Sequence, residues 1–297
     1  MIIIRSPQRI SIGGGGTDLK SYYSRFGGEF ISAAIDKYIY VSIIKPFKNG
    51  IYLKYSDNEK VRKISDITHP IFKEVLKKYE SSNNQIEITT LADIPSGTGL
   101  GSSGSFTTAL IKGLHSYRYL DISKRDLAEA ACEIEIDILK EPIGKQDQYI
   151  SSFGGIKQFE IKKNGDVVVK NLSISTETLT NLEENLLLFF TGYTRKASSI
   201  LKDQDKKTSK EDSFMLEQMH FVKEMCSNIR SALENGDLEK FGDLLNRHWQ
   251  EKKKRSNNMS NDKIDQYYDI ALKNGAIGGK VVGAGGGGFL MFYANEA

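Results

Sequence analysis

Short apolar runs bounded by turn-forming residues dominate the first part of the chain, and they predict strands. One of them, residues 85–91, alternates branched apolar with polar side chains, which is the pattern of a half-buried strand. The expected strands are 2–4, 30–35, 38–44, 51–55, 85–91, 156–161, 167–172 and 186–190. The segment 48–50 (Lys-Asn-Gly) between two of them is a turn signal typical of hairpins.

Apolar residues at three- and four-residue steps predict helices, and the second half of the chain is mostly helical until its end. Ser123 with Asp126 opens one helix in the manner of a capping box, and Gly236 and Gly275 each stop another. The expected helices are 19–26, 70–79, 106–117, 124–140, 211–234, 238–255 and 263–274. We place a domain boundary in the polar run 173–185, which predicts domains 1–180 and 181–297.

A glycine- and serine-rich segment, residues 93–105, lies between the strand 85–91 and the helix 106–117. Glycine lets backbone N–H groups turn toward a ligand without a side-chain clash, and a helix N-terminus adds about +0.5 charge in the same direction. Serine hydroxyls at the helix start can cap the helix or bind a phosphate or a metal ion. The order of strand, glycine loop and helix therefore predicts a polyphosphate site.

Two better-known glycine loops do not account for this segment. A Walker loop requires a lysine after its glycines, and none follows here. Gly99, Gly101 and Gly104 match the dinucleotide fingerprint, but a second match within 283–288 runs into an apolar strand instead of a helix. Because neither match has the strand–turn–helix context that dinucleotide binding requires, we exclude an oxidoreductase of that class.

Three carboxylates are candidates for chemistry, and two of them leave a structural alternative open. Asp18 follows four consecutive glycines and suits either recognition of neighbouring sugar hydroxyls or an N-cap for the helix 19–26. Asp147 follows the helix breaker Pro142 and suits either a general base or a turn residue. Glu135 has apolar neighbours in a helix, which is an unusual place for a solvated charge.

Two segments of the second half carry more glycine or more positive charge than their elements need. Residues 283–288 contain five glycines between two apolar strands, whereas a hairpin turn needs two or three at most. The surplus predicts that another part of the protein packs against bare backbone. The basic run 252–255 suits an anion site or, as cations at a helix C-terminus often are, a solvated helix end.

Composition removes several classes of function. The 41 basic and 38 acidic residues give a net charge of +3, a near balance that argues against binding to nucleic acid or a membrane surface. No apolar run approaches a membrane span, and the first residues do not form a signal peptide. The cysteines and histidines lack disulfide or metal-ligand spacing. We expect a soluble cytoplasmic protein, and the sequence does not set its oligomeric state.

Four segments in a fixed order resemble the GHMP small-molecule kinases. They are residues 6–10 with 15–18, residues 95–103, residues 142–148 and residues 283–288. The resemblance implies ATP and Mg²⁺ as cofactors. It also implies a two-domain α+β fold, with a left-handed βαβ unit in the N-terminal domain and a ferredoxin-like C-terminal domain.

The resemblance further implies roles for individual residues. Asp147 would be the general base on the acceptor hydroxyl, and Arg9 would orient that hydroxyl and stabilise charge during phosphoryl transfer. Glu135 and Ser103 would hold Mg²⁺. The ATP phosphates would be bound by Pro95, Gly97, Thr98, Gly99, Leu100, Gly101, Ser102, Ser103, Gly104 and Ser105. The sugar would be bound by Gly15, Gly16, Thr17, Asp18, Gly144, Gly285 and Gly286.

Within the family, the four-glycine segment, the segment 191–198 and the pair Trp249 and Lys252 resemble the D-glycero-D-manno-heptose 7-phosphate kinases. Such kinases phosphorylate the anomeric oxygen of a sugar that already carries a phosphate, which implies a small sugar-phosphate substrate. We expect Arg195 and Lys196 at the distal phosphate, with Lys252 and Lys253 behind them. A fucose or uronic-acid sugar-1-kinase and a catalytically silent sugar or nucleotide sensor are the alternatives.

Overall fold

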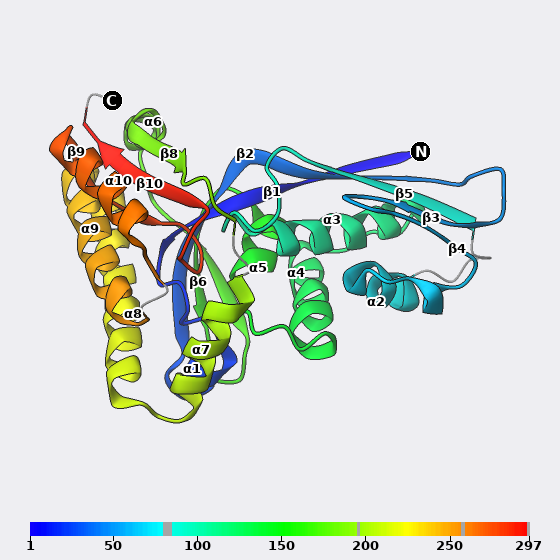
Figure 1. Ribbon diagram of the computed structural model, residues 1–297, viewed down its shortest axis with the longest axis horizontal. Coiled ribbons are helices and arrows are strands. Elements are labelled where there is room, and N and C mark those ends of the chain that lie inside the picture. Colours follow the sequence, from blue (N-terminus) through cyan, green and yellow to red (C-terminus); the bar gives the residue numbers. More distant parts are fainter. Residues whose placement is uncertain (80–84, 195–196, 257–258, 296–297) are drawn as a thin grey trace.

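The computed structural model describes residues 1–79, 85–194, 197–256 and 259–295 (Figure 1). Its strands are β1 Ile2–Gly13, β2 Gly28–Ile44, β3 Gly50–Lys54, β4 Asn58–Val61, β5 Gln85–Ala92, β6 Ile156–Ile161, β7 Val167–Asn171, β8 Leu186–Phe190, β9 Ala276–Val281 and β10 Phe289–Ala294. Its helices are α1 Lys20–Phe26, α2 Pro70–Tyr79, α3 Ser102–Tyr117, α4 Lys124–Cys132, α5 Gln146–Phe153, α6 Thr176–Asn185, α7 Ala197–Ser209, α8 Ser213–Glu234, α9 Leu238–Lys254 and α10 Asp262–Lys273. A 3-10 turn at Ile64–Asp66 and a π-helix at Glu133–Ile138 complete the described elements.

The larger sheet is built around β2, which is long enough to pair with three other strands. Residues 28–33 of β2 pair with β6, residues 39–44 pair with β5, and β1 runs antiparallel to both parts. The strand order is β4-β3-β5-β2-β6-β7, with β1 attached to β2. The register between β1 and β2 shifts between Pro7 and Arg9. Such a bulge redirects the side chains beside it, and Arg9 follows it directly.

The turn signal at 48–50 does not join a hairpin. β3 pairs in parallel with β5, which the chain reaches through β4 and α2, and β5 lies between β2 and β3 in the sheet. A local turn signal reports that the chain reverses, but it does not determine which strand fills the neighbouring place. The elements β3, α2 and β5 form a parallel βαβ unit.

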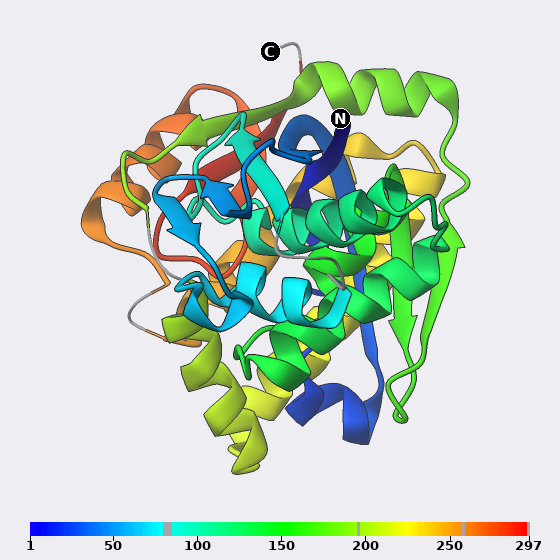
Figure 2. The same ribbon diagram turned by 90° about the vertical axis from the view of Figure 1, so that its right-hand side faces the viewer.

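Helices α2, α3 and α4 lie together along one face of the larger sheet (Figures 1 and 2). On α3, Leu110 and Leu114 are spaced by one helical turn and are fully buried. They share a core with Phe72 of α2 and with Val41 and Ile88 of the sheet. Burial of each such side chain stabilises the fold by about 1.5–3 kcal/mol, and it fixes the start of α3 relative to the strands.

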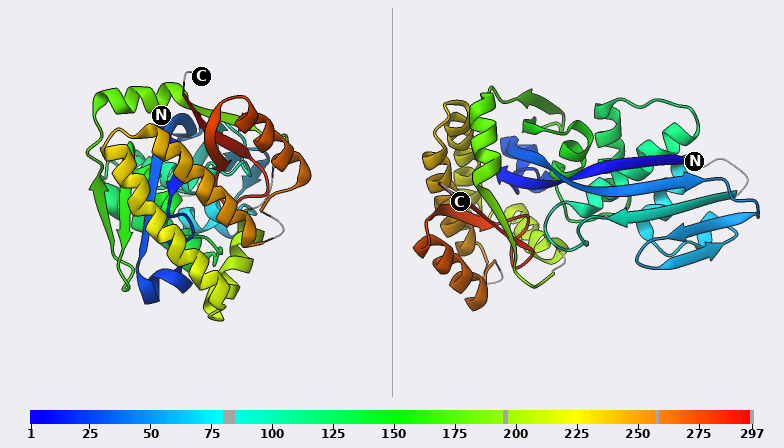
Figure 3. Two further views of the ribbon diagram at one scale, coloured as in Figure 1. Left: turned by 90° about the vertical axis from the view of Figure 1, so that its left-hand side faces the viewer. Right: turned by 90° about the horizontal axis from the view of Figure 1, so that it is seen from above.

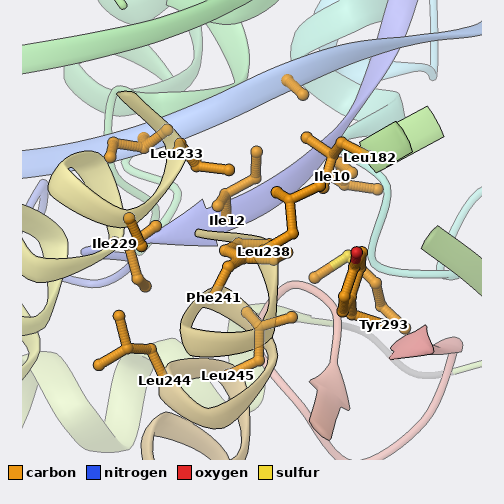
Figure 4. Packing of buried hydrophobic residues seen from close by; sticks show 14 of the residues in the cluster. Ile10, Ile12, Leu182, Ile229, Leu233, Leu238, Phe241, Leu244, Leu245 and Tyr293 are labelled. Carbon is orange, nitrogen blue, oxygen red and sulfur yellow. The ribbon is translucent and has the colours of Figure 1, made fainter. Parts of the chain in front are cut away.

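The smaller sheet has the order β8-β10-β9, and β9 and β10 form the predicted antiparallel hairpin. Helices α8 and α9 lie at one end of the larger sheet (Figure 3). Ile10 and Ile12 of β1 there join a core with Ile229 and Leu233 of α8 and Phe241 of α9 (Figure 4). The two parts of this two-domain α+β fold are therefore held together by a common hydrophobic core.

The sequence patterns did not predict β4, α5, α6 or α7. Helix α6 occupies the polar run 173–185, and it buries only Thr178 and Leu182, so its apolar signal is weak. Residue 180 lies inside this helix, and the division into domains 1–180 and 181–297 stays a prediction. The helix predicted over 124–140 continues beyond Cys132 as the π-helix. Within the described residues, no helix is both long enough and apolar enough to cross a membrane.

Candidate active site

A cavity of about 500 Å³ lies where the glycine loop before α3 meets the start of α5 and the helix α9. Both halves of the chain line it. From the first half come Arg9, Ser11, Gly15, Gly16, Asp18, Leu19, Pro70, Ile71, Ser96, Gly97, Gly99, Gly101, Ser102, Ser103, Leu139, Glu141, Ile143, Gly144, Gln146 and Asp147. From the second half come Leu201, Gln204, His248, Lys252, Arg255, Lys280, Val281, Gly283 and Ala284.

The segment between β5 and α3 has the geometry expected of a polyphosphate loop. Gly97, Gly99 and Gly101 have positive φ angles of 79°, 84° and 75°, a region that side chains other than glycine rarely enter. Gly101 is the N-cap of α3, and its side-chain-free backbone leaves the first turn of the helix open. The hydroxyls of the first turn are already held in place: Ser102 Oγ accepts a hydrogen bond from Gln8 Nε2 at 2.8 Å, and Ser105 Oγ donates to Pro7 O at 2.8 Å.

The glycine-rich tip of the last hairpin packs directly on this loop. A Cβ atom added to Gly288 would lie 2.1 Å from Thr98 O, and one added to Gly283 would lie 2.6 Å from Gly99 O. A Cβ on Gly99 would in turn lie 2.7 Å from Val282 O. The prediction that another part of the protein contacts this bare backbone is therefore confirmed, and that part is the polyphosphate loop itself.

Arg9 and Asp147 form an ion pair in the wall of the cavity. Arg9 donates to Asp147 Oδ1 from Nε at 2.9 Å, and its Nη2 lies 2.7 Å from the same oxygen. Arg9 also donates from Nη1 to Gly99 O. The Arg9 side chain is 7% exposed and that of Asp147 is 26% exposed. A carboxylate with one oxygen held by a guanidinium and partial access to the cavity can accept a proton from a bound hydroxyl.

Glycines at the start of α3 bring this pair close to the polyphosphate loop. A Cβ on Gly104 would lie 2.6 Å from the Asp147 Cβ, and one on Gly101 would lie 3.1 Å from the Arg9 Cγ. A side chain at either position would push the pair away. Asp147 is the second residue of α5, an element that the sequence patterns did not predict.

Glu135 lies in the π-helix, is fully buried, and faces the start of α3. Its carboxylate accepts hydrogen bonds from Ser103 Oγ and, at 2.7 Å, from Gln148 Nε2. Burial raises the pKa of Glu135 to about 7, and the hydrogen bonds from Ser103 and Gln148 oppose that shift. The buried negative charge is thus incompletely compensated within the protein.

The pair of Ser103 and Glu135 fits a magnesium ion. Mg²⁺ is usually bound through one or two carboxylates together with the phosphates of its substrate, rather than by a cage of protein ligands. In the part of the chain that the structure describes, no three His, Cys, Asp or Glu residues cluster as a metal site. A single buried carboxylate beside a hydroxyl at the polyphosphate loop matches the usual arrangement, in which one or two carboxylates and the substrate phosphates hold the Mg²⁺ ion.

Asp18 joins the opposite side of the cavity to the start of α5. Its Oδ1 accepts from Gly16 N at 2.9 Å and its Oδ2 from Gln146 N at 3.0 Å. Burial raises the pKa of Asp18, as does the nearby charge of Asp147, while the backbone hydrogen bonds lower it. Gly144 makes room for this carboxylate, because a Cβ there would lie 2.0 Å from Asp18 Oδ2. The N-cap alternative for Asp18 is wrong, since no side chain caps α1.

The remaining residues predicted for the sugar differ in their positions. Gly15 lines the cavity, but the Thr17 hydroxyl is engaged by Gly14 O at 2.8 Å and by Glu29 O at 2.6 Å. Gly285 and Gly286 pack against Met259, and Gly283 and Ala284 line the cavity instead. Arg195 and Lys196 lie outside the described residues. The substrate roles of all these residues stay predictions.

A group of basic side chains lies on the α9 side of the cavity, and the sequence analysis considered Lys252 and Arg255 of this group for an anion but missed His248 and Lys280. His248, Lys252 and Arg255 are spaced at i, i+4 and i+7 along α9, and Lys280 of β9 lies beside them. All four are buried and line the cavity, so Lys252 and Arg255 do not form a solvated helix end. The helical spacing was visible in the sequence, but the approach of Lys280 was not.

Lys253 faces another way. Its ammonium group lies 3.4 Å from Asp265 Oδ1 and 5.9 Å from the centre of the Trp249 ring, and the residue does not line the cavity. The prediction that Lys253 supports the distal phosphate is therefore not supported by its position. Lys253 is therefore a suitable control position for substitutions at Lys252 and Arg255.

Comparisons with known proteins agree with this geometry. The chain matches the models for the GHMP kinases N terminal domain over residues 67–155 and for the GHMP kinases C terminal over residues 229–297. It is 32% identical to a D-glycero-alpha-D-manno-heptose 7-phosphate kinase of Campylobacter jejuni, over 98% of this chain and 88% of that one. It is 26% identical to an L-fucokinase/L-fucose-1-P guanylyltransferase of Bacteroides fragilis, of which it spans 34%.

Among solved structures, one of a D-glycero-D-manno-heptose 1-phosphate kinase from a Bacteroides species, B. thetaiotaomicron, superimposes with a TM-score of 0.80 at 26% identity, over 99% of this chain and 89% of that one. A phosphomevalonate kinase of Streptococcus pneumoniae also has a TM-score of 0.80, over 100% of this chain and 93% of that one. At 14% identity, the second likeness concerns the fold alone.

Proposed function

Because this chain belongs to the GHMP kinase family, we propose that it transfers the γ-phosphoryl group of ATP to the anomeric hydroxyl of D-glycero-D-manno-heptose 7-phosphate. The product would be the 1,7-bisphosphate, for synthesis of nucleotide-activated heptose in the cytoplasm. That the chain is an ATP-dependent sugar kinase follows from its family and relatives. The choice of sugar is supported by the relative that it matches over nearly its whole length.

The observation that carries the proposal is the Arg9–Asp147 pair beside the polyphosphate loop. Phosphoryl transfer depends mainly on positioning and on stabilising charge. A sugar hydroxyl in the cavity would give its proton to Asp147, whose Oδ1 is held by Arg9 and whose side chain is partly open to the cavity. The Arg9 guanidinium, which also contacts Gly99 O, would stabilise the charge that develops between the hydroxyl and the loop.

Ser103 and Glu135 would hold Mg²⁺, which when bound neutralises charge on the ATP phosphates. Asp18 would accept hydrogen bonds from sugar hydroxyls, since the backbone N–H groups of Gly16 and Gln146 fix both of its oxygens. It lies in the same cavity as Asp147, so a sugar held by Asp18 would present another hydroxyl to the base.

Release of ADP with Mg·ATP and a panel of sugars tests the reaction. The panel contains heptose 7-phosphate, mannose 6-phosphate, fucose, galactose and glucuronic acid. We expect turnover with the phosphorylated sugars and strongest turnover with the heptose. Turnover with fucose or glucuronic acid alone would support the kinase activity but contradict heptose 7-phosphate as the substrate. No turnover across the panel, with ATP still bound, would favour the sensor.

Asp147→Asn tests the role of the base. Removing the proton acceptor while keeping the shape of the side chain should lower kcat by about 100-fold or more and leave ATP binding largely unchanged. The control is Asp36→Asn, because the Asp36 side chain is 85% exposed and lies outside the cavity. If the Asp147→Asn enzyme had the kcat of the wild type, Asp147 would not be the general base.

A further inference from the structure

The basic residues His248, Lys252, Arg255 and Lys280, which we call the cationic wall, have no anionic partner among the described residues. None of them forms an ion pair with a described carboxylate. Lys252 Nζ donates to Gly283 O at 2.6 Å and Lys280 Nζ donates to Ile12 O at 2.6 Å. Lys280 Nζ also lies 3.3 Å from His248 Nδ1. These contacts fix the positions of the cations but do not neutralise their charge.

Arg255 is the least satisfied member of the cationic wall. The residue is 4% exposed, and its Nε and Nη2 atoms are buried without a hydrogen-bond partner among the residues that the structure describes. The charge of Glu251 acts on it, but the Glu251 carboxylate already accepts from Lys254 Nζ at 2.6 Å and from Gln218 Nε2 at 3.3 Å. A buried guanidinium with unmade hydrogen bonds destabilises a protein, because the desolvation of its N–H groups is not compensated. The unsatisfied Arg255 guanidinium therefore indicates that a ligand binds beside it.

The mutual repulsion of these groups indicates an anion in particular. Burial lowers the pKa of Lys280 to about 7 and that of Arg255 to about 10. Burial also lowers the pKa of Lys252 and of His248 well below their usual ranges, and the neighbouring cations add to each shift. A ligand with two negative charges, bound in the cavity, would attract these side chains and offset their mutual repulsion. A guanidinium fork matches the oxygens of a phosphate, with which it can form paired hydrogen bonds.

The members of the cationic wall lie on different sides of the cavity: Lys252 Nζ donates to Gly283 O, which packs on the polyphosphate loop, whereas Lys280 lies on the side of β1. Lys280 reaches the last residues of β1, directly before the glycines that precede Asp18. The ATP phosphates belong at the start of α3, beside Gly101 and Ser103. Arg9, which forms the ion pair with Asp147, is near both regions, because it contacts Gly99 and its charge also lowers the pKa values of Lys252 and Lys280.

We propose that Arg255, Lys252 and Lys280 bind the non-reacting phosphate of a sugar-phosphate substrate, while its anomeric hydroxyl faces Asp147. This proposal rests on the kinase function proposed above and gives its sugar site a second anchor point. The unphosphorylated parent sugar would leave the cationic wall unpaired and would bind weakly. The specificity for a phosphorylated sugar would therefore come from α9 and β9.

Arg255→Met tests the site, since methionine keeps an unbranched apolar side chain and removes the charge. We expect the KM for heptose 7-phosphate to rise about 10- to 100-fold, as loss of charged hydrogen bonds predicts. The kcat, the KM for ATP and the KM for unphosphorylated heptose should change less than about twofold, because these depend on the other side of the cavity. Lys253→Met, on the same helix but outside the cavity, should leave all four values unchanged.

Binding without turnover gives an independent measurement. Trp249 is the only tryptophan, lies on α9 between His248 and Lys252, and is fully buried. Its fluorescence should report mannose 6-phosphate binding in the absence of ATP, more tightly than mannose, and Arg255→Met should remove the difference. Arg255→Lys should retain part of it, because the charge remains but the fork is lost.

The outcomes distinguish this inference from the proposed function. An equal rise in KM for phosphorylated and free heptose would overturn the phosphate site and leave the kinase. An unchanged KM for heptose 7-phosphate in a folded Arg255→Met enzyme would do the same. A third outcome separates the two proposals: no sugar is turned over, yet the wild type binds mannose 6-phosphate more tightly than mannose and Arg255→Met does not. This result would support the anion site and contradict the kinase function.

Discussion

Lys280 shows how a single buried charge ties stability to pH. Its folded-state pKa of about 7 lies below the usual 10.5, so the unfolded chain binds more protons than the folded chain between these values. With respect to Lys280, the free energy of unfolding is therefore highest above pH 10.5. It decreases as the pH falls toward 7, and this contribution is lost as the pH falls through 7. The protein without ligand should gain stability from Lys280 as the pH rises from neutral.

Lys280→Met should remove this dependence. From pH 7 to pH 9, the free energy of unfolding of the wild type should rise relative to that of the variant by roughly 2 kcal/mol. Urea unfolding at pH 7, 8 and 9 measures it. Burial raises the pKa of Cys132 in both proteins alike, whereas the charge of Lys280 lowers the pKa values of Cys226, Lys252 and His248, so the comparison reports Lys280 together with its effect on these neighbours. Parallel pH profiles for the two proteins would show that Lys280 is not held as a destabilised cation.

At the scale of residues, the sequence predicted the groups that stand in recognisable motifs. Asp147, Arg9 and Glu135 were expected through the family resemblance, and the structure brings each of them to the polyphosphate loop. Arg255 was noted only as part of the basic run 252–255, with a solvated helix end as the alternative, and Lys280 belongs to no pattern that predicted a site. They come together only when β9 packs beside α9, a contact between distant segments that no local pattern encodes.

At the scale of elements, periodicity predicted those with strong apolar faces and failed where few side chains are buried. Helix α2 was predicted with its observed ends, and β5 to within a residue. Helix α6 was missed because it buries only two residues, and α5 because its start carries the polar groups of the site. The π-helix was also invisible to a helical period, although it holds Glu135.

The contact between the two glycine loops predicts the effect of one added methyl group. Gly288→Ala would place a Cβ 2.1 Å from Thr98 O at a φ of +90°, so the polyphosphate loop must move. We expect ATP affinity to fall at least about tenfold, since the loop amides would lose their alignment, and stability to fall by roughly 2 kcal/mol. Titration with ATP and urea unfolding measure the two effects.

Gly275→Ala is the matched control for that substitution. Its φ of +101° imposes a similar backbone strain, but no atom of a described residue lies within 4 Å of the added Cβ. It should lose about 1–2 kcal/mol of stability and bind ATP as the wild type does. Equal ATP affinities for Gly288→Ala and Gly275→Ala would show that the hairpin tip does not support the loop.

At the scale of the whole molecule, the shared core predicts that the protein unfolds as one unit despite its two domains. Phe241 is fully buried in that core, between β1 and the smaller sheet (Figure 4). Phe241→Ala should destabilise the protein by about 3–5 kcal/mol, and a single calorimetric transition should shift as a whole. Phe47→Ala, at a fully exposed position, should leave Tm unchanged. Two transitions, of which Phe241→Ala shifts one, would mean that the domains fold independently.

The backing of one glycine loop by the other also bears on how the enzyme is made in the cell. Residues 283–288 leave the ribosome after every other residue that lines the cavity, and only then does Gly288 reach Thr98. Until that point the loop at 97–101 is held by β1, through Arg9, and lacks the hairpin tip on its other side. A nascent chain of this protein would therefore not capture ATP during translation, and the nucleotide would bind only to the finished molecule.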